Sequence, residues 1–198
     1  MQSVFLLPLV FLYSLLLANI KIEIPPEKKI VTPIQTKVIN KVVIKVDDGQ
    51  PWGVAKQIDA VTWQMKVGED AKMATPGEIL SALNVYRIRY GSQILTWDDK
   101  LANYAKSRAV YFNKIKDLDG HKGFQDFLNN QDGFNKLGFN RLGENASFGY
   151  RLSGVHLIEW VYAGDDPHNK NQLNNNWNYV GIGVDGTSTA LIFGTGRF

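Results

Sequence analysis

The sequence predicts an α+β fold in which helices come first and a C-terminal β-hairpin completes the sheet. Apolar residues recur at helical spacing over residues 76–117, and two strand-like runs joined by a turn lie near the end of the chain. The composition agrees with a folded domain, since 44% of the 198 residues are hydrophobic and 21% are charged.

The first predicted helix begins at a capping box. Thr75 can cap the helix, Pro76 suits the first helical position, and Glu78 can reach back to the cap. We expect Gly91 to end this helix. Its apolar face is predicted to consist of Ile79, Leu83, Tyr86 and Tyr90.

A short segment, residues 94–97, leads to a second predicted helix that Asp98 caps. This helix is expected to stop near residues 117–120. Its apolar face contains Leu101, Ala105, Ala109 and Phe112.

Residues 121–152 hold five glycines and are predicted to be rich in loops. The phenylalanines of this segment are expected to pack as a small cluster beneath the loops, namely Phe124, Phe127, Phe134 and Phe139.

A third helix is predicted to start at Ser153 and to end near Ala163 and Gly164. Two strands follow over residues 179–184 and 190–193, and residues 185–188 join them as a hairpin turn.

The N-terminal part of the chain has a different character. Residues 4–18 are apolar and uncharged, a length that suits the core of a signal peptide better than a spanning helix. Residues 1–20 are therefore predicted to be a signal peptide or an N-terminal membrane anchor. We expect a protein that is secreted or held at the cell surface or in the periplasm, with residues 4–20 as the anchor if they are not cleaved.

The remaining chain divides into three parts. Residues 21–51 form a basic, proline-containing tether, which we interpret as a solvated, self-repelling segment. Residues 52–75 are predicted to pack on the core as a pre-domain segment. Residues 76–198 are the compact domain.

Composition excludes several classes of function. The chain has no cysteine, which excludes a disulfide framework, a thiolate metal site and a cysteine nucleophile. The net charge of +3 is a weak field over this length, so a nucleic-acid partner is not expected. Neither a His-Glu-x-x-His helix nor a Gly-x-Ser-x-Gly elbow nor a phosphate-binding glycine loop occurs.

The chain has only three histidines, so each can be weighed singly. His121 and His168 follow short acidic segments in predicted loops, where functional sites tend to lie. His156 stands three residues before Glu159 in the first turn of the third helix. That lone pair favours a solvated helix face over a site.

Short segments of the domain occur in a family's order along residues 76–198: Leu83–Arg87, Leu95–Trp97, Leu101–Ala102 with Ala105 and Arg108–Ala109, Gly120–His121, Leu142–Ala146, Trp160, His168 with Asn171 and Leu173, and Val180–Val184. In this order they resemble the CAP superfamily, also called SCP/PR-1-like after cysteine-rich secretory proteins, antigen 5 and PR-1. The similarity is to its short, disulfide-free bacterial branch.

The resemblance implies an α-β-α sandwich with a cleft lined by two histidines and two acids. Residue by residue, His121, Glu144 and His168 are three of the four, and they are the candidate metal ligands and catalytic residues. Two neutral imidazoles can bind zinc or another divalent cation, and a nearby carboxylate can hold its water or act as a base.

The fourth position departs from the family's pattern. Ala163 stands where eukaryotic members place an acid, three residues after Trp160. Asp165 or Asp166 is a candidate substitute, and the alternative is that both are turn residues before Pro167.

The other candidates keep structural alternatives too. Glu144 could instead cap a helix or pair with Arg141, and His121 and His168 could be satisfied loop imidazoles that bind nothing.

The fold does not settle the activity, because CAP proteins share no single agreed function. The first hypothesis is an exported module with a metal-capable cleft that binds a protein, a lipid or an envelope polymer. The second is a metal-dependent hydrolase that acts on peptides or envelope polymers. The third is a lipid- or sterol-binding protein, which would need an apolar groove.

Overall fold

The structure is a computed structural model in which residues 49–198 are described. The predicted signal or anchor segment and almost all of the tether lie outside the described residues. Within residues 49–198, no helix is both long enough and apolar enough to span a bilayer.

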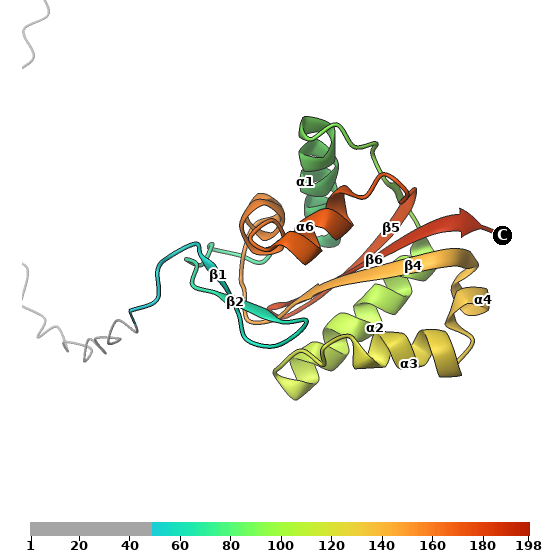
Figure 1. The fold of residues 1–198 in the computed structure, drawn as a ribbon, viewed down its shortest axis with the longest axis horizontal. Helices are drawn as coiled ribbons and strands as arrows, with labels where there is room; N and C mark the ends of the chain where they lie inside the picture. The colour runs from blue at the N-terminus through green and yellow to red at the C-terminus, as the bar shows by residue number, and fades with distance from the viewer. Residues whose placement is uncertain (1–48) are drawn as a thin grey trace, which may run out of the picture. The chain divides into compact units, whose positions relative to one another are not determined.

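A four-stranded sheet lies between two layers of helices, which confirms the predicted α-β-α sandwich (Figure 1). Its order is β3-β5-β6-β4, with β3 parallel to β5 and the other pairs antiparallel. The strands are β3 (Thr96–Trp97), β4 (Phe139–Ser147), β5 (Tyr179–Asp185) and β6 (Ser188–Arg197). The first helical layer consists of α1 (Pro76–Arg89), α5 (Gly154–His156), the π-helix η1 (Leu157–Tyr162) and α6 (Asp166–Leu173). The second consists of α2 (Asp99–Ile115), α3 (Lys122–Asn130) and α4 (Gly133–Leu137).

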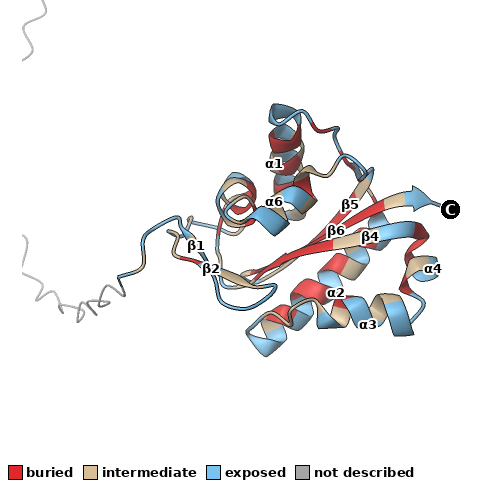
Figure 2. Cartoon of the chain, viewed as in Figure 1, coloured by how far each residue is buried: buried red, intermediate tan, exposed pale blue. Residues whose placement is uncertain are grey.

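The sheet has a hydrophobic core on each face, and alternate side chains of the inner strand β6 pack into one core and then the other. Leu191 and Phe193 pack with the layer of α1, whereas Ala190 and Ile192 pack with the layer of α2. Because neighbouring side chains of a strand point to opposite faces, one strand can fill two cores. Figure 2 shows this strand buried along most of its length.

Two glycines allow α2 to lie directly on the sheet. A Cβ atom at Gly181 would stand 2.0 Å from the backbone nitrogen of Ala102, and one at Gly183 would stand 2.2 Å from the carbonyl carbon of Ala105. Only glycine leaves room for so close a contact between a helix and a strand.

The predicted helix starts are confirmed. Thr75 and Glu78 form the reciprocal capping box of α1, and the Asp98 carboxylate accepts a hydrogen bond from the backbone N–H of Leu101 at 3.0 Å. Ser153 caps α5. The prediction for Tyr90 is wrong, because α1 ends one residue earlier and this side chain is 58% exposed.

The loop-rich prediction for residues 121–152 is wrong. This segment contains α3, α4 and the long strand β4, and its glycines fall largely at the junctions. Phe124, Phe127 and Leu128 have the spacing of a helix face. The prediction of loops gave more weight to the glycines of this segment than to that spacing. Phe124, Phe127 and Phe139 of the expected cluster belong to the core beside α2, where Phe139 is completely buried, whereas Phe134 lies outside that core.

Residues 52–75 contain a small antiparallel hairpin, β1 (Ala55–Gln57) and β2 (Trp63–Met65). The N–H groups of Asp70 and Ala74 donate to the carbonyl oxygens of Arg151 and Leu152, each at 2.9 Å. These bonds hold the segment against the sandwich just before α5.

One buried arginine fixes α6 relative to α1. The Arg87 guanidinium is fully buried and donates to the carbonyl oxygens of Gln93 at 2.7 Å and Asn174 at 3.2 Å, and also to that of Gln172. It thereby ties the end of α1 to the end of α6, the helix that carries His168.

Candidate functional site

Glu144 lies in the middle of β4, not in one of the loops predicted for residues 121–152. It pairs across the sheet with Ile192, which faces α2, and cross-strand partners share a face. Its carboxylate therefore points toward α2 and is 1% exposed. There the Arg108 guanidinium donates from Nε to Oε1 at 2.7 Å and from Nη2 to Oε2 at 3.2 Å.

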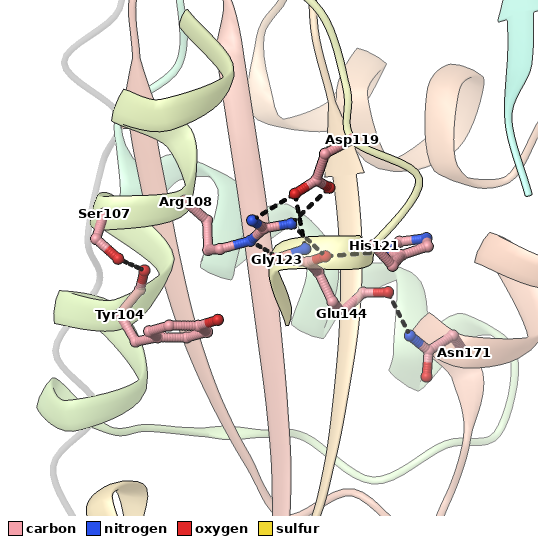
Figure 3. A network of polar contacts seen from close by, with 8 residues as sticks. All are labelled: Tyr104, Ser107, Arg108, Asp119, His121, Gly123, Glu144 and Asn171. Atoms are coloured by element: carbon pink, nitrogen blue, oxygen red, sulfur yellow. Dashed lines mark hydrogen bonds and ion pairs between the residues drawn. The ribbon is translucent and has the colours of Figure 1, made fainter. Parts of the chain in front are cut away.

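The same guanidinium holds a second acid. Nη1 and Nη2 of Arg108 donate to the two carboxylate oxygens of Asp119, each at 2.8 Å, so Arg108 lies between Asp119 and Glu144 (Figure 3). Burial alone would raise the pKa of Asp119, but the bonds from Arg108 and from the Gly123 N–H hold this pKa below its usual value. Burial would lower the pKa of Arg108, and its two acidic partners raise it above the usual value instead.

His121 is placed by a turn between α2 and α3. Gly120 and His121 both have positive φ angles, 61° and 63°, so the chain reverses sharply at this point. The turn brings the His121 ring to Glu144, where Nδ1 lies 2.8 Å from Oε2. The connected network thus runs from Asp119 through Arg108 and Glu144 to His121 (Figure 3).

His168 lies in the first turn of α6, not in a loop as predicted. Asp165 is the N-cap of that helix and accepts the backbone N–H of His168 at 3.0 Å. The same carboxylate also holds the ring, since Nδ1 of His168 lies 2.7 Å from Oδ2. One residue therefore fixes both the helix start and the imidazole.

The two imidazoles come together at one cavity. Their ring centroids are 6.5 Å apart, and both residues line a cavity of about 480 Å³ with Asp165 and Tyr162. An ionised carboxylate accepts hydrogen bonds but donates none, so the proton of each contact lies on Nδ1, and the neutral form of either ring then has its lone pair on Nε2. The hydrogen bonds of both rings within residues 49–198 are at Nδ1.

Hydroxyl groups lie beside these rings. Ser147 and Thr189 share a hydrogen bond of 2.6 Å, and the Tyr162 hydroxyl contacts Thr189 at 2.5 Å. Burial raises the pKa of Tyr162 to about 12, so its hydroxyl stays neutral at physiological pH. The Tyr162 ring is 5.9 Å from that of His168, and Ser147 also lines the cavity.

Residues 143–145, with the sequence Gly-Glu-Asn, form hydrogen bonds with both histidines. Asn145 points to the opposite face of β4 from Glu144, and its Nδ2 donates to the backbone oxygen of His168 at 3.0 Å. Asn171 of α6 donates to the side-chain oxygen of Asn145 at 2.8 Å. A Cβ at Gly143 would stand 2.9 Å from the Trp177 ring, so the smallest residue is needed there.

The two imidazoles are the candidate ligands for a cation. Two neutral imidazoles with carboxylate-bound Nδ1 atoms form the arrangement that orients histidine ligands in metal sites. Residues 49–198 contain no group of three or more His, Cys, Asp or Glu side chains placed to hold one ion. Both Glu144 oxygens are bonded to Arg108 and His121, so a role for Glu144 as a direct ligand stays a prediction.

The remaining candidates lie elsewhere. Asp166 is exposed and pairs with Lys170 at 2.8 Å, and Arg141 lies over the Trp177 ring instead of pairing with Glu144. His156 contacts the Asp70 carboxylate at 2.7 Å and stacks on Trp160 with 3.5 Å between centroids. It is therefore a partnered residue outside the cleft and not a freely solvated one.

Sequence reasoning missed Arg108 and Asp119 as parts of the site. A signal for Arg108 was present, because this arginine follows Ala105 by three residues and so shares the apolar face of its helix. A charge on a buried helix face needs a buried partner. Nothing in the sequence marked Asp119 as that partner.

The sandwich and its histidine-carboxylate cleft define the class of protein. The family profile described as "CAP: Cysteine-rich secretory protein family" matches residues 80–191. The chain belongs to the CAP family. No curated protein matches its sequence.

Solved structures of bacterial proteins are similar to this chain. An extracellular protein containing an SCP domain from Bacillus anthracis is 25% identical with a TM-score of 0.51, over 61% of this chain and 40% of that one. A cysteine-rich secretory protein from Staphylococcus aureus is 19% identical with a TM-score of 0.50, over 61% and 38%. An outer surface protein from Borrelia burgdorferi is 19% identical with a TM-score of 0.48, over 61% and 90%. The matched region thus spans about two fifths of each of the first two proteins.

Proposed function

We propose that this protein is an exported binding module whose cleft holds a divalent cation, such as zinc, between His121 and His168. The observation that carries the proposal is the pairing of each ring with its own carboxylate, Glu144 for His121 and Asp165 for His168. This pairing occupies Nδ1 of each ring and leaves Nε2 as the atom that would bind a ligand in the shared cavity.

The rings lie near the spacing of a shared ion but not at it. Zinc bound tetrahedrally by two imidazole nitrogens at the usual lengths puts the ring centroids about 5 Å apart, and the observed separation is 6.5 Å. Binding would therefore draw the two rings together by about 1 Å or more. Two protein ligands leave positions for water or for a group of the partner, so the cation would serve as a bridge to what the module binds.

Zinc titration of the purified full-length chain by calorimetry tests the proposal. We expect one site per chain, and we expect replacement of both cleft histidines by alanine to abolish it. His156→Ala is the matched control, because this histidine also contacts a carboxylate but lies outside the cavity. Unchanged binding after loss of both cleft histidines would reject the proposal.

Binding is better supported than hydrolysis. A general base must reach the reacting water, whereas the Glu144 side chain is 1% exposed and its carboxylate already accepts three hydrogen bonds from Arg108 and His121. If the protein were a metal-dependent hydrolase, Glu144→Gln would abolish turnover. A binding module has no turnover to lose, and the same change should only weaken binding of the cation, and with it of the partner, because His121 loses its carboxylate.

Lipid binding is a second candidate because of a separate hollow between α1 and α5. It has a volume of about 830 Å³, and its lining includes Ala82, Val85 and Val155 together with charged residues at Glu78 and Arg89. An apolar wall with a charged rim is the chemistry that an acyl chain with an anionic head would need. Competition between a fluorescent fatty acid and palmitate would test it, with Ala82→Glu as the blocking variant.

Export is proposed from two observations. Residues 4–18 have the apolar core of a signal sequence, and the similar Bacillus anthracis protein is described as extracellular. Sequencing the N-terminus of the mature protein distinguishes cleavage near residue 20 from retention of residues 4–20 as an anchor. An intact N-terminus on a protein recovered from the cell interior would contradict export.

A further inference from the structure

The β1–β2 hairpin, defined as residues 54–67, forms a wall of the histidine cavity. Residues of β1, of the turn and of β2 all line this cavity together with His121 and His168. The hairpin precedes the region that matches the family profile, which begins at residue 80. Part of the enclosure of the cleft is therefore built by a segment that precedes the matched region.

The hairpin contacts the segments that carry both histidines. The Trp63 ring meets the His168 ring edge to face, with centroids 5.7 Å apart and planes at 81°. At the turn, a methyl group of Val61 lies 3.4 Å from the position that a Cβ of Gly120 would occupy, next to His121. One wall thus spans from one imidazole to the other.

The inner strand of the hairpin is held in place by the sandwich. The Met65 N–H donates to the Tyr150 hydroxyl, and that hydroxyl donates to the Met65 carbonyl, each at 3.2 Å. The Met65 methyl group lies 2.0 Å from where a Cβ of Gly164 would be, so it packs on the loop that leads to Asp165. The turn is held by bonds of its own, including one from the Val61 N–H to the Asp59 carboxylate at 2.9 Å.

This arrangement limits the size of what can reach the imidazoles. A cavity of about 480 Å³ has the size of a site for a small molecule. A polymer strand would need a groove open at both sides of the histidines, and the hairpin covers one side. A two-stranded hairpin is also a weak element alone, so a substitution in it can open the cavity without unfolding the sandwich.

We propose that Trp63 is a specificity-determining residue: with the hairpin turn, it admits compact ligands, such as a hydrated divalent cation, to His121 and His168 and excludes bulky ones. The choice of ligand rests on the function proposed above, whereas the shielding of the rings does not. The two statements can therefore be tested separately.

The first experiment needs no metal. The full-length chain is treated with diethyl pyrocarbonate, and the modification rate of each histidine is measured by mass spectrometry. In Trp63→Ala we expect His168 to react about two- to tenfold faster. An edge-to-face ring contact changes the equilibrium between shielded and accessible ring positions by about this factor. His121 should also react faster, whereas His156 serves as an internal reference and should not change.

Two further variants control this experiment. Trp52→Ala removes another indole next to the hairpin, one that is 65% exposed and does not line the cavity, and it should leave all three rates unchanged. Trp63→Tyr keeps a ring near His168 and should keep the slow rate. Unchanged cleft rates in Trp63→Ala, or an equal rise at His156, would overturn the proposal.

The second experiment tests selectivity by size. Wild-type protein should bind nickel ions but not nickel carried by nitrilotriacetate, and Trp63→Ala should bind both. Equal binding of both probes by the wild type would contradict the assigned selectivity. If neither protein binds nickel, the proposed cation site fails, and the modification rates alone decide whether Trp63 shields the rings.

Discussion

Arg108 of α2 donates two hydrogen bonds to the carboxylate of Glu144, at 2.7 and 3.2 Å. Only 6% of the arginine side chain and 1% of the glutamate side chain are exposed. The pair joins the second helical layer to the edge strand β4. Because Glu144 in turn holds His121, the ion pair connects the core of the sandwich to the cleft.

Loss of this arginine should be costly. Arg108→Met leaves the carboxylates of Glu144 and Asp119 buried without their cation, and breaking such a pair costs about 3–5 kcal/mol. Urea unfolding of the full-length chain measures the change. The matched control is Arg89→Met, whose ion pair with Glu159 is largely exposed and should cost no more than about 1 kcal/mol. Equal effects of the two changes would contradict the network.

The histidine-bound carboxylates should control the affinity for the cation. Asp165→Asn keeps an acceptor for the helix cap but weakens the hold on Nδ1 of His168, and loss of such a partner typically lowers metal affinity about 10–100-fold. Zinc titration measures the loss. Asp166→Asn is the adjacent control, because Asp166 is exposed and contacts Lys170. An equal loss in both variants would show that charge near α6, and not orientation of the ring, sets the affinity.

Asp119 should make stability fall in acid. The pKa of Asp119 in the folded protein lies below its usual value of 3.8, because the bonds from Arg108 outweigh burial. The unfolded chain therefore takes up the proton first, so the stabilisation is complete above about pH 4 and is lost as the pH falls through the folded pKa. Urea midpoints measured over this range should fall less steeply in Asp119→Asn. The same slope in both proteins would exclude Asp119 as a source.

The contact between α2 and β5 should tolerate no methyl group. Gly181→Ala would force the backbone of Ala102 to move and should destabilise the protein by about 3 kcal/mol. Gly77→Ala is the control, because nothing lies within 4 Å of the added atom, and its effect should stay within about 1 kcal/mol. A small effect at Gly181 would mean that helix and strand lie farther apart than described.

Local signals in the sequence predicted much of the fold. The helix starts were predicted correctly, because Thr75, Asp98 and Ser153 are residue types that cap helices and each side chain accepts a hydrogen bond from a backbone N–H nearby in the sequence. Strand β4 was missed because its sequence is not strand-like by itself. Its pairing with β6 over residues 139–147 is a long-range contact, which no local pattern encodes.

The candidate site residues were named from the sequence, but the hydrogen bonds that hold them were not. His121, Glu144 and His168 were identified by resemblance, and the structure brings them together. The partner of each ring depends on backbone direction: Asp165 reaches His168 because Asp165 is the N-cap of α6 and His168 lies in the first turn of that helix. The hairpin wall was not predicted, since the position of Trp63 against His168 follows from packing between distant segments.

The most direct test of the shared cation site follows the ring protons of all three histidines by NMR during titration with zinc, with single His→Ala variants for assignment. The account predicts that the signals of His121 and His168 shift together, saturate at one zinc per chain and give one common dissociation constant, while His156 stays in place. A shift of only one cleft histidine, or an equal response of His156, would contradict a cation held between the two rings.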